Sequence, residues 1–561
     1  MSVVARSQYQ QFAAPSGDGT ALVQPPLREL VTNLAPPTFV GTDHGVEFCG
    51  KPLDLVRQEA RREVVHRAVE YTRSYRDLPA PTWNAESLPE IILSGHQPEL
   101  FHCGVWFKNF LLSQLASKTG AIGINFLVDN DLCRSTAIRV PSQNPLRAGA
   151  SATDGAAENS DLIFQSVPFD APHGAVPWEL RQLQSQSTWE AFPKMVEQAM
   201  LPGLARPMLL DCWPDAVAAV RRNNRPGLAI AEMRHKLEER LGLQTLEVPL
   251  SHLVSTRAFA RFSIQLLSEL PRFQEIYNSR LKLYRAAHRI RSHAHPVPEL
   301  AQEHGWLEAP WWVYRPEAPQ RQPLWVRVVD EQLILSDRAG WQSTIEGRLD
   351  CDNASSQWLE FQLDGICLRP RALLTTMYLR IMVSDLFIHG IGGGKYDQLT
   401  DGIVRDFFGI EPSAMAVATA TLHLPMGTRA PAENGGVLSD LEAQRSAERD
   451  KLWQLKYHAE QVSEVTSQEQ QQLADRKQQL LANIPPRGEK WRWHREITAI
   501  NKRLSELAAP LAEQSRDMLK TIADQERDHR ILQSRETSFC LFPLEPVNTQ
   551  LTALAKPQVG S

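Results

Sequence analysis

The sequence predicts an α/β protein with a parallel sheet core, an inserted α+β unit and a C-terminal antiparallel coiled-coil arm. Three observations lead to this fold class. Residues 91–108 form an apolar strand that runs into a Gly/His/Pro loop and then an amphipathic segment. Residues 121–128 are an uninterrupted apolar run, which is typical of a strand buried on both faces of a parallel sheet. From 438 to 536, Gln, Glu, Lys, Arg and Leu dominate and glycine nearly vanishes, which indicates a helical arm.

The composition predicts a folded, multidomain, soluble protein, because 561 residues with 42% hydrophobic content can bury one large core or several ordinary ones. A net charge of −5 gives no global attraction to nucleic acid or an acidic membrane, so we expect small-molecule substrates as partners. The first residues lack the apolar core of a signal peptide, and no run approaches the ~18 apolar residues of a membrane span. We therefore expect a cytoplasmic protein.

The seven cysteines are scattered and include no C-x-x-C pair. This pattern fits reduced thiols in a cytosol better than a disulfide framework or a zinc ribbon. Zinc held by His96, His102, Cys103 and Cys133 is not expected, because the adjacent side chains of His102 and Cys103 usually point apart.

The chain divides into six predicted parts: an N-terminal arm and helix (1–87), a first part of the core (88–260), an inserted Trp-rich unit (261–345), a second part of the core (346–435), the helical coiled-coil arm (436–536) and a C-terminal segment (537–561). Residues 1–40 are proline-rich and predict an extended segment. Residues 53–76 have helical spacing and end before Pro79 and Pro81. A helix at 105–115 then joins the two apolar strands into one βαβ unit.

Further elements are predicted along the middle of the chain: a long loop at 142–175, a strand at 208–212, a helix at 228–241, a strand at 366–370 that resumes the core, and a helix at 372–387. The tryptophans of the inserted unit are expected to form its core rather than a sugar-stacking platform. They are Trp306, Trp311, Trp312 and Trp325.

The sequence of the arm predicts two antiparallel helices joined at a break at 484–488. Leucine and isoleucine recur at a/d spacing both before and after this break. Pro510 should kink the second helix. Aromatic side chains beyond this stripe predict a homodimer through the arm, since exposed aromatic groups usually seek a partner surface. They are Trp453, Tyr457, Trp491 and Trp493. Residues 539–543 are apolar enough to form a returning edge strand.

The loop after the first strand carries the first candidate site residues. Gly95 and Gly104 would let the backbone approach a ligand closely, and His96 and His102 supply donors that can carry charge near neutral pH. A helix that follows a parallel strand points its free N–H groups at anions. The two histidines are therefore candidate catalytic residues for phosphate chemistry, and Lys108 is a candidate ligand contact one turn into the helix.

Two further segments could meet this loop at the same edge of the sheet. Asp129 and Asp131 end the second strand, where carboxylates can bind an amine, a ribose hydroxyl or Mg²⁺, and we expect both to be catalytic residues together with the two histidines. Residues 390–395 form a glycine loop in which Gly392, Gly393 and Gly394 could cradle phosphate, with Lys395 adding a point charge. This loop lacks the spacing and the Ser/Thr of a Walker A motif.

Each candidate also has an ordinary structural interpretation. A histidine in a tight turn often serves as a hydrogen-bonding group, and Lys108 could be a solvated face residue. Strand-end acids also cap the turns that follow them, and the glycine loop could be a mobile turn.

The spacing of Gly95, Pro98, His102 and Gly104 resembles the strand-to-helix loop of the class I nucleotidyltransferases and aminoacyl-tRNA synthetases, with Val105 in place of the second histidine. Three motifs in order also resemble the bacillithiol synthase family of cysteine-adding enzymes. They are Gly95-His-Gln97 with Gly104 and Lys108; Val128-Asp-Asn-Asp131; and Arg369-Pro370 followed by Gly392-Gly-Gly394 and Tyr396-Asp-Gln-Leu399. His96, Asn130 and Lys395 depart from that family's glutamine, histidine and glutamate.

The resemblance implies a Rossmann-type core, a dimerising helical arm, and a ligase that joins a cysteine carboxyl to the amine of a sugar-derived acceptor. ATP or ADP would bind at Gly95, Gln97, Gly104, Lys108 and the glycine loop, with Mg²⁺ as a possible partner. Two alternatives stay open: a nucleotidyltransferase of the same fold, and a non-catalytic nucleotide-binding scaffold in which Val105 and Asn130 reflect lost chemistry.

Overall fold

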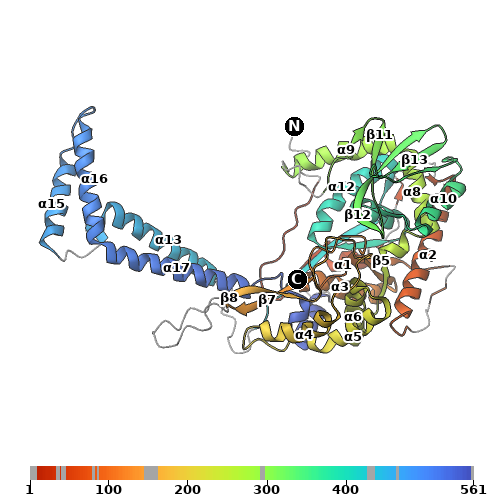
Figure 1. Ribbon diagram of the computed structural model, residues 1–561, viewed down its shortest axis with the longest axis horizontal. Helices are drawn as coiled ribbons and strands as arrows, with labels where there is room; N and C mark the ends of the chain where they lie inside the picture. Colours follow the sequence, from red (N-terminus) through yellow and green to blue (C-terminus); the bar gives the residue numbers. More distant parts are fainter. Residues whose placement is uncertain are drawn as a thin grey trace.

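A six-stranded sheet lies at the centre of the molecule and is covered by helices on both faces (Figure 1). The structure is a computed structural model. It describes residues 9–32, 34, 38–39, 46–78, 83–84, 87–144, 162–290, 297–425, 436–462 and 467–556.

The central sheet has the strand order β1-β18-β16-β5-β6-β9. Its strands are β1 (Thr20–Gln24), β5 (Ile91–His96), β6 (Ile122–Leu127), β9 (Leu246–Pro249), β16 (Leu386–His389) and β18 (Ala414–Thr421). All pairs are parallel except that of β1 with β18. Numbered along the chain, the five parallel strands follow the order 3-2-1-4-5, which is consistent with a Rossmann-like core. The direction of winding reverses between β5 and β16.

Side chains of each parallel strand alternate between two hydrophobic layers, as the period of a strand requires. Ile91 and Leu93 of β5 face one layer, and Ile92 faces the other. The helices of the first layer are α2 (Leu53–Arg73), α8 (Arg257–Ser268), α9 (Leu270–Ala287), α10 (Cys351–Leu363), α11 (Ala372–Met382) and α12 (Ile391–Phe408). Those of the second layer are α3 (Cys103–Thr119), α4 (Gln186–Ala199), α5 (Leu209–Asn223), α6 (Pro226–Arg240) and α18 (Leu544–Leu554). The predicted helices at 53–76, 105–115 and 228–241 are therefore confirmed.

A second, antiparallel sheet covers part of the first layer. Its strands are β10 (Gln302–Glu303), β11 (Trp306–Arg315), β12 (Ala318–Val329), β13 (Gln332–Ser336), β14 (Gln342–Ile345) and β15 (Cys367–Pro370). Trp311 and Trp325 are buried, as predicted for core residues, whereas Trp306 and Trp312 are half-buried. Trp311 belongs to the same hydrophobic cluster as Ile91 of the central sheet, so the second sheet packs onto the core continuously.

The remaining elements are short. Three two-stranded sheets pair β2 (Thr38–Phe39) with β17 (Ile410–Glu411), β3 (Glu47–Phe48) with β4 (Lys51–Pro52), and β7 (Ala137–Gln143) with β8 (Leu162–Pro168). The short helices are α1 (Leu27–Thr32), α7 (Leu250–Leu253) and the 3₁₀ helix η2 (Phe539–Leu541). Within the described residues, no helix is both long and apolar enough to cross a bilayer.

The arm extends away from the sheets as a helical hairpin (Figure 1). Its helices are α13 (Gly436–Tyr457), α14 (Ala459–Val462), α15 (Gln468–Ala482), α16 (Lys490–Leu507) and α17 (Ala509–Leu532). The predicted break falls between α15 and α16, and a small apolar cluster around Leu455, Ile500 and Leu504 holds the hairpin together. Pro510 lies in the first turn of α17, just after the one-residue break at Ala508 between α16 and α17. These two helices meet at an angle (Figure 1), so the predicted kink is confirmed. The coiled-coil geometry itself stays a prediction.

Several predicted elements are wrong because a short apolar run does not distinguish a strand from a helix. Residues 208–212 begin α5, whose buried face continues through Trp213 and Val220. Residues 539–543 form η2 and lead into α18 instead of an edge strand. The predicted helix at 372–387 ends at Met382, and its last residues belong to the parallel strand β16.

Other errors concern pairing. The strand at 366–370 was expected in the core but pairs with β11 of the second sheet. The N-terminal segment was expected to be an extended arm, yet its β1 forms the edge of the central sheet. The predicted loop at 142–175 contains β8 and the end of β7, and its residues 145–161 lie outside the described residues.

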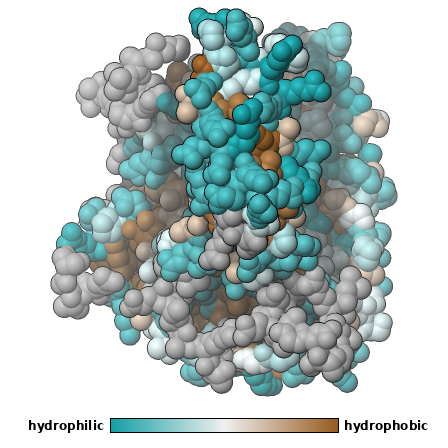
Figure 2. Space-filling view, turned by 90° about the vertical axis from the view of Figure 1, so that its left-hand side faces the viewer, coloured by the Kyte–Doolittle hydropathy of each residue, from teal (hydrophilic) through white to brown (hydrophobic). Residues whose placement is uncertain are grey.

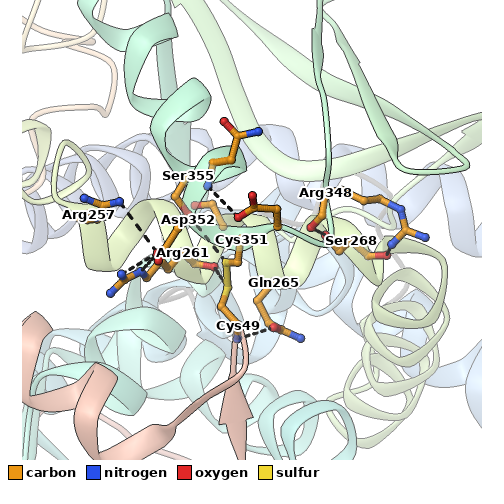
Figure 3. Close-up of a disulfide and its surroundings, with 12 residues drawn as sticks. Cys49, Arg257, Arg261, Gln265, Ser268, Arg348, Cys351, Asp352 and Ser355 are labelled. Carbon is orange, nitrogen blue, oxygen red and sulfur yellow. Dashed lines mark hydrogen bonds and ion pairs between the residues drawn. A yellow bond between two sulfur atoms is a disulfide. The ribbon is translucent and has the colours of Figure 1, made fainter.

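The prediction of reduced thiols is wrong for one pair. Cys49 of the β3–β4 turn and Cys351 at the start of α10 form a disulfide with a Cα–Cα distance of 5.5 Å (Figure 3). The backbone N–H of Cys49 also donates to Gln265, and Arg261 pairs with Asp352 beside the bridge. The other five cysteines are buried and free. The two bonded residues are 302 positions apart in the sequence, so spacing alone carries no signal of their contact.

Candidate functional site

The three predicted site segments lie at one edge of the central sheet. His96 ends β5, Asp129 follows β6, and the glycine segment follows β16, and these three parallel strands are neighbours. The carboxyl ends of parallel strands share one edge, and the winding of this sheet reverses between β5 and β16. The expected meeting of the segments at this edge is confirmed.

His102 has a clear structural duty at the start of α3. It is the N-cap residue, and its Nδ1 accepts a hydrogen bond from the backbone N–H of Gly104 at 3.1 Å. Its Nε2 lies 3.6 Å from a carboxylate oxygen of Glu536. Burial lowers the pKa of His102, while Glu536 opposes that shift. The ring is thus held between α3 and the end of the arm.

The two glycines of this loop are explained by packing. A Cβ on Gly104 would lie 2.4 Å from the carbonyl oxygen of Ala420, and one on Gly95 would lie 2.4 Å from the ring of Phe126. Both distances are far below an ordinary contact, so a side chain at Gly104 would force α3 away from β18, and one at Gly95 would displace the ring of Phe126. The fold requires these glycines whether or not a ligand binds.

Lys108 is the most unusual residue of the site. Its side chain is only 3% exposed, and its Nζ donates to the carbonyl oxygen of Gly95 at 2.7 Å. No carboxylate pairs with it in the part of the chain that the structure describes. Burial, and then the charge of Arg234, lower the pKa of Lys108 to about 7. A buried cation without a carboxylate partner is rare in proteins.

The charge of Lys108 reaches three histidines. It lowers the pKa of His96, His102 and His389. For His96 burial is the larger cause, and the two effects bring its pKa to about 3, so the ring is neutral at physiological pH. The imidazole ring of His96 packs edge-on against the ring of Phe101, with the two ring centroids 5.1 Å apart. Lys108 therefore lies beside the end of β5, and its charge acts on His389 at the end of β16.

The acids after β6 are tied to their surroundings. Asp129 is buried and accepts hydrogen bonds from the backbone N–H and the hydroxyl of Ser251. Burial, and then the charge of Glu179, raise its pKa to about 7. Asp131 is partly exposed and accepts from Gln97 at 2.9 Å and from Arg321 at 3.2 Å. The bond from Gln97 joins the β5 and β6 loops.

Sequence reasoning missed the charged partners of these acids. Arg369 donates to both carboxylate oxygens of Glu179 at 2.9 Å, and the hydroxyl of Tyr314 also donates to Glu179. The backbone N–H of Glu179 donates in turn to the carbonyl oxygen of Asp129 at 2.7 Å. Arg369 could have been found, since it stands in the Arg-Pro motif. Glu179 follows no strand and shows no pattern that would single it out.

The predicted glycine loop is a helix, because Gly390 is the N-cap of α12 and the glycines occupy its first turn. Gly394 packs against β18, since a Cβ there would lie 2.3 Å from a methyl carbon of Val417. Gly392 and Gly393 are exposed, and Lys395 is half-buried. Nothing lies within 4 Å of a Cβ built on Gly390 or Gly392, and neither residue has a positive φ.

A histidine and an aspartate that sequence analysis did not select complete this edge. His389 ends β16, and its Nε2 lies 2.8 Å from a carboxylate oxygen of Asp397 on α12. Asp397 also accepts from Thr376 at 2.6 Å and from Arg380 at 2.8 Å. The sequence holds one signal for this pair: a histidine at the end of an apolar run, eight residues before an aspartate on the following helix.

A cavity of about 540 Å³ lies elsewhere, at the amino edge of the sheet. Arg73, Arg76, Trp83, Glu239 and Gln244 are among its lining residues. Its size suits a small ligand. Its buried arginine already has partners, because Arg76 donates to the carbonyl oxygen of Leu243 at 2.9 Å and lies 3.1 Å from Glu239. The buried cation that lacks a carboxylate partner in the described residues, Lys108, is at the opposite edge, and we place the candidate site there.

Metal binding receives no direct support, since within the described ranges no group of three or more His, Cys, Asp or Glu side chains could hold a metal ion. Mg²⁺ usually needs only one or two carboxylates together with substrate phosphates, so the possible Mg²⁺ stays a prediction.

Compared with known proteins, the chain matches no protein-family model and no curated protein.

Proposed function

We propose that this protein is an enzyme that binds ATP or another phosphate-bearing ligand between the ends of β5 and β16. We further propose that it joins the carboxyl group of an amino acid such as cysteine to an amine, as the resemblance to the bacillithiol synthase family implies. The observation that carries this proposal is the buried ammonium of Lys108, which has no carboxylate partner in the described residues.

An anion would relieve the cost of that burial. A charged group in a low-dielectric site is stable only when it is paired, and Lys108 shows the effect of missing a partner in its lowered pKa. A bound phosphate would raise this pKa and draw the lysine into its charged form. Ligand binding at pH 7 to 8 should therefore take up a proton.

The first turn of α12 supplies a second set of donors at the same edge. The first N–H groups of a helix have no partner within it, and its N-terminus attracts anions. Gly390 and Gly392 leave the backbone bare there, although nothing in their packing or dihedral angles requires glycine. Glycine within a helix costs roughly 0.5–1 kcal/mol relative to alanine. Close approach of a ligand to the backbone would explain these residues.

The charges after β6 suit the ammonium group of an amino-acid donor. Arg321 pairs with Asp131, Arg369 pairs with Glu179, and the buried carboxyl group of Asp129 is bound to Ser251. A bound ammonium group would lower the raised pKa of Asp129 and draw its carboxyl group into the charged form, and Asp131 is the partly exposed member of the set.

The test is an assay with ATP, cysteine and a mixture of cell thiol precursors, read by mass spectrometry. We expect an ATP-dependent product heavier than the acceptor by cysteine less water. Lys108→Met should abolish product formation, whereas Lys118→Met, which changes an exposed lysine on the same helix, should not. If calorimetry finds no nucleotide binding to the wild-type protein at millimolar concentration, the proposal fails.

The same assay separates the two alternatives. A nucleotidyltransferase would release pyrophosphate and leave a nucleotide on the product, and a scaffold would bind ATP without turnover. We also propose that the arm forms a coiled coil that makes the protein a homodimer. Finally, we propose that the protein acts on small molecules in the cytoplasm rather than on nucleic acid or membranes, in line with its net charge of −5.

A further inference from the structure

His389 and Asp397 form a buried pair whose geometry defines the state of the imidazole. The Nε2 of His389 lies 2.8 Å from a carboxylate oxygen of Asp397. Burial opposes ionisation of Asp397, but the charge of Arg380, together with hydrogen bonds from His389 and Thr376, holds its pKa well below the usual range. An ionised carboxylate can only accept hydrogen bonds, so Nε2 carries the hydrogen and Nδ1 carries the lone pair. Burial lowers the pKa of His389, which keeps the ring neutral.

The lone pair on Nδ1 faces the first turn of α12. A Cβ on Gly393 would lie 2.8 Å from Nδ1, so any other residue at this position would cover that atom. Gly393 itself is exposed, and Nδ1 has no hydrogen-bond partner among the described residues. The ring is 6% exposed and stacks on Phe387 with centroids 4.2 Å apart. A neutral, rigidly held nitrogen thus opens onto the place where the proposed function puts the ligand.

We propose that His389 is the general base of this site, with Asp397 and Arg380 as its positioning residues. This inference rests on the proposed function. Nδ1 of His389 takes a proton from the acceptor amine as the amine nitrogen bonds to the carbonyl carbon of the activated carboxylate. The bond from that carbon to the phosphate-bearing leaving group breaks, and the leaving group keeps the electron pair. Lys108 and the N-terminus of α12 neutralise its charge.

The charged groups around the ring set the expected pH dependence. They are Asp397 of α12, Arg380 of α11 and Lys108 of α3, with Asp401 of α12 bound to Arg380. The base must be neutral, so kcat/KM should fall as the pH drops through the lowered pKa of His389. On the alkaline side, Lys108 must be charged, so activity should fall above its pKa, which is about 7 in the free protein. The profile should be bell-shaped.

The test compares His389→Gln and Asp397→Asn with a control variant, His423→Gln. His423 follows the end of β18, and its Nδ1 lies 4.0 Å from a carboxylate oxygen of Asp18. We expect His389→Gln to lower kcat/KM roughly 10²- to 10⁴-fold, to abolish the acid limb of the pH profile and to leave ATP binding unchanged. The His423 variant should behave like the wild type. Added imidazole should restore part of the activity of His389→Ala, which a purely structural role would not allow.

The outcomes separate the two proposals. A wild-type protein that neither binds ATP nor forms an amide overturns the proposed function and this inference together. A wild-type protein that forms the amide while His389→Gln retains its rate and acid limb overturns the inference alone. If Asp397→Asn unfolds, as shown by its melting curve, the imidazole rescue of His389→Ala decides the question.

Discussion

At the scale of single residues, the site depends on ionisable groups whose charged form is disfavoured by burial. Lys108 is kept buried with a single backbone acceptor, and Asp129 has a pKa raised to about 7. Groups with strongly shifted pKa values concentrate at functional sites, where a protein loses some stability in keeping the residues that its function needs. A lysine retained in such a place is easier to explain by an anion that it binds than by its contribution to folding.

Replacing this lysine should therefore stabilise the free protein. The pKa of Lys108 is about 7 in the folded chain against an ordinary value of 10.5, so between these values the unfolded chain binds more protons than the folded chain. Stability of the wild type should rise with pH across this window, because the cost of the buried charge disappears as the lysine loses its proton. Lys108→Met should raise the free energy of unfolding by roughly 1–3 kcal/mol at pH 7.

Denaturant unfolding at pH 7 and pH 9.5 checks this prediction. The gain from Lys108→Met should shrink at the higher pH, and Lys118→Met should show neither effect. If Lys108→Met is less stable than the wild type at pH 7, the ammonium group of Lys108 already has enough hydrogen-bond partners within the folded chain.

At the scale of elements, α12 combines glycines of two kinds. Gly394 is required by contact with β18, whereas Gly392 meets nothing within 4 Å. Gly394→Ala should lower the free energy of unfolding by about 1–3 kcal/mol, because the added methyl group overlaps Val417. Gly392→Ala should leave stability unchanged or raise it by up to about 1 kcal/mol, yet weaken ATP binding. Thermal melts and calorimetry on both variants measure the contrast, and unchanged ATP binding by Gly392→Ala would argue against a ligand at this turn.

The helical arm also has surface residues that the fold of a single chain does not explain. Trp453 is 57% exposed and Trp491 is 61% exposed, while Trp493 donates its N–H to the carbonyl oxygen of Leu480 and packs within the hairpin. Figure 2 views the molecule from the side of the arm, and the near surface is largely hydrophilic with several apolar areas. Large aromatic groups left exposed on such a surface are typical of a contact with another chain.

We expect the full-length protein to be a dimer through this arm. Light scattering at micromolar concentration should give twice the chain mass, and replacing residues 438–536 by a short linker should give the monomer mass. Trp453→Glu combined with Trp491→Glu should also weaken the dimer, whereas Arg503→Glu with Glu469→Arg, which reverses an exposed ion pair of the arm, should not. A monomeric full-length protein would show that these aromatic groups serve another purpose.

At the scale of the whole molecule, two places compete for a ligand. The carboxyl edge holds the unpaired charge and the glycine-rich first turn, while the amino edge holds the cavity near Trp83 and Arg76. Buried charge favours the carboxyl edge for a phosphate, since at the cavity Arg76 already pairs with Glu239 and Arg73 is exposed to solvent.

Hydrogen exchange measured with and without ATP distinguishes the two edges. Protection should appear in the first turns of α3 and α12 and should be absent near Gly120 and Gly242 at the cavity. Arg73→Ala, at the rim of the cavity, should bind ATP like the wild type. Protection confined to the amino edge would move the nucleotide to the cavity and remove the main support for the proposed function.

Two of the six strands of the central sheet were predictable from local pattern. Residues 91–96 and 122–127 are apolar runs long enough to identify buried parallel strands, and their positions imply that His96 and Asp129 share an edge. β16 was missed because its four residues follow a helical pattern without a break. Its place in the sheet depends on Asp385, which accepts hydrogen bonds from Arg57 and from the N–H of Ile91.

The sequence by itself determined the α/β class, the helical arm, the first βαβ unit, the places of His96 and Asp129 at strand ends, and the place of Lys108 in the helix that follows the first strand. Each of these follows from residues close together in the chain, where hydrophobic period and strand ends are read directly. The tertiary structure alone decided that Cys49 meets Cys351, that Glu179 meets Arg369, and that the chain's fourth parallel strand brings His389 beside α12. It also decided that Lys108 is buried without a carboxylate partner in the described residues, because burial and charge pairing depend on segments that are distant in sequence and meet only when the chain folds.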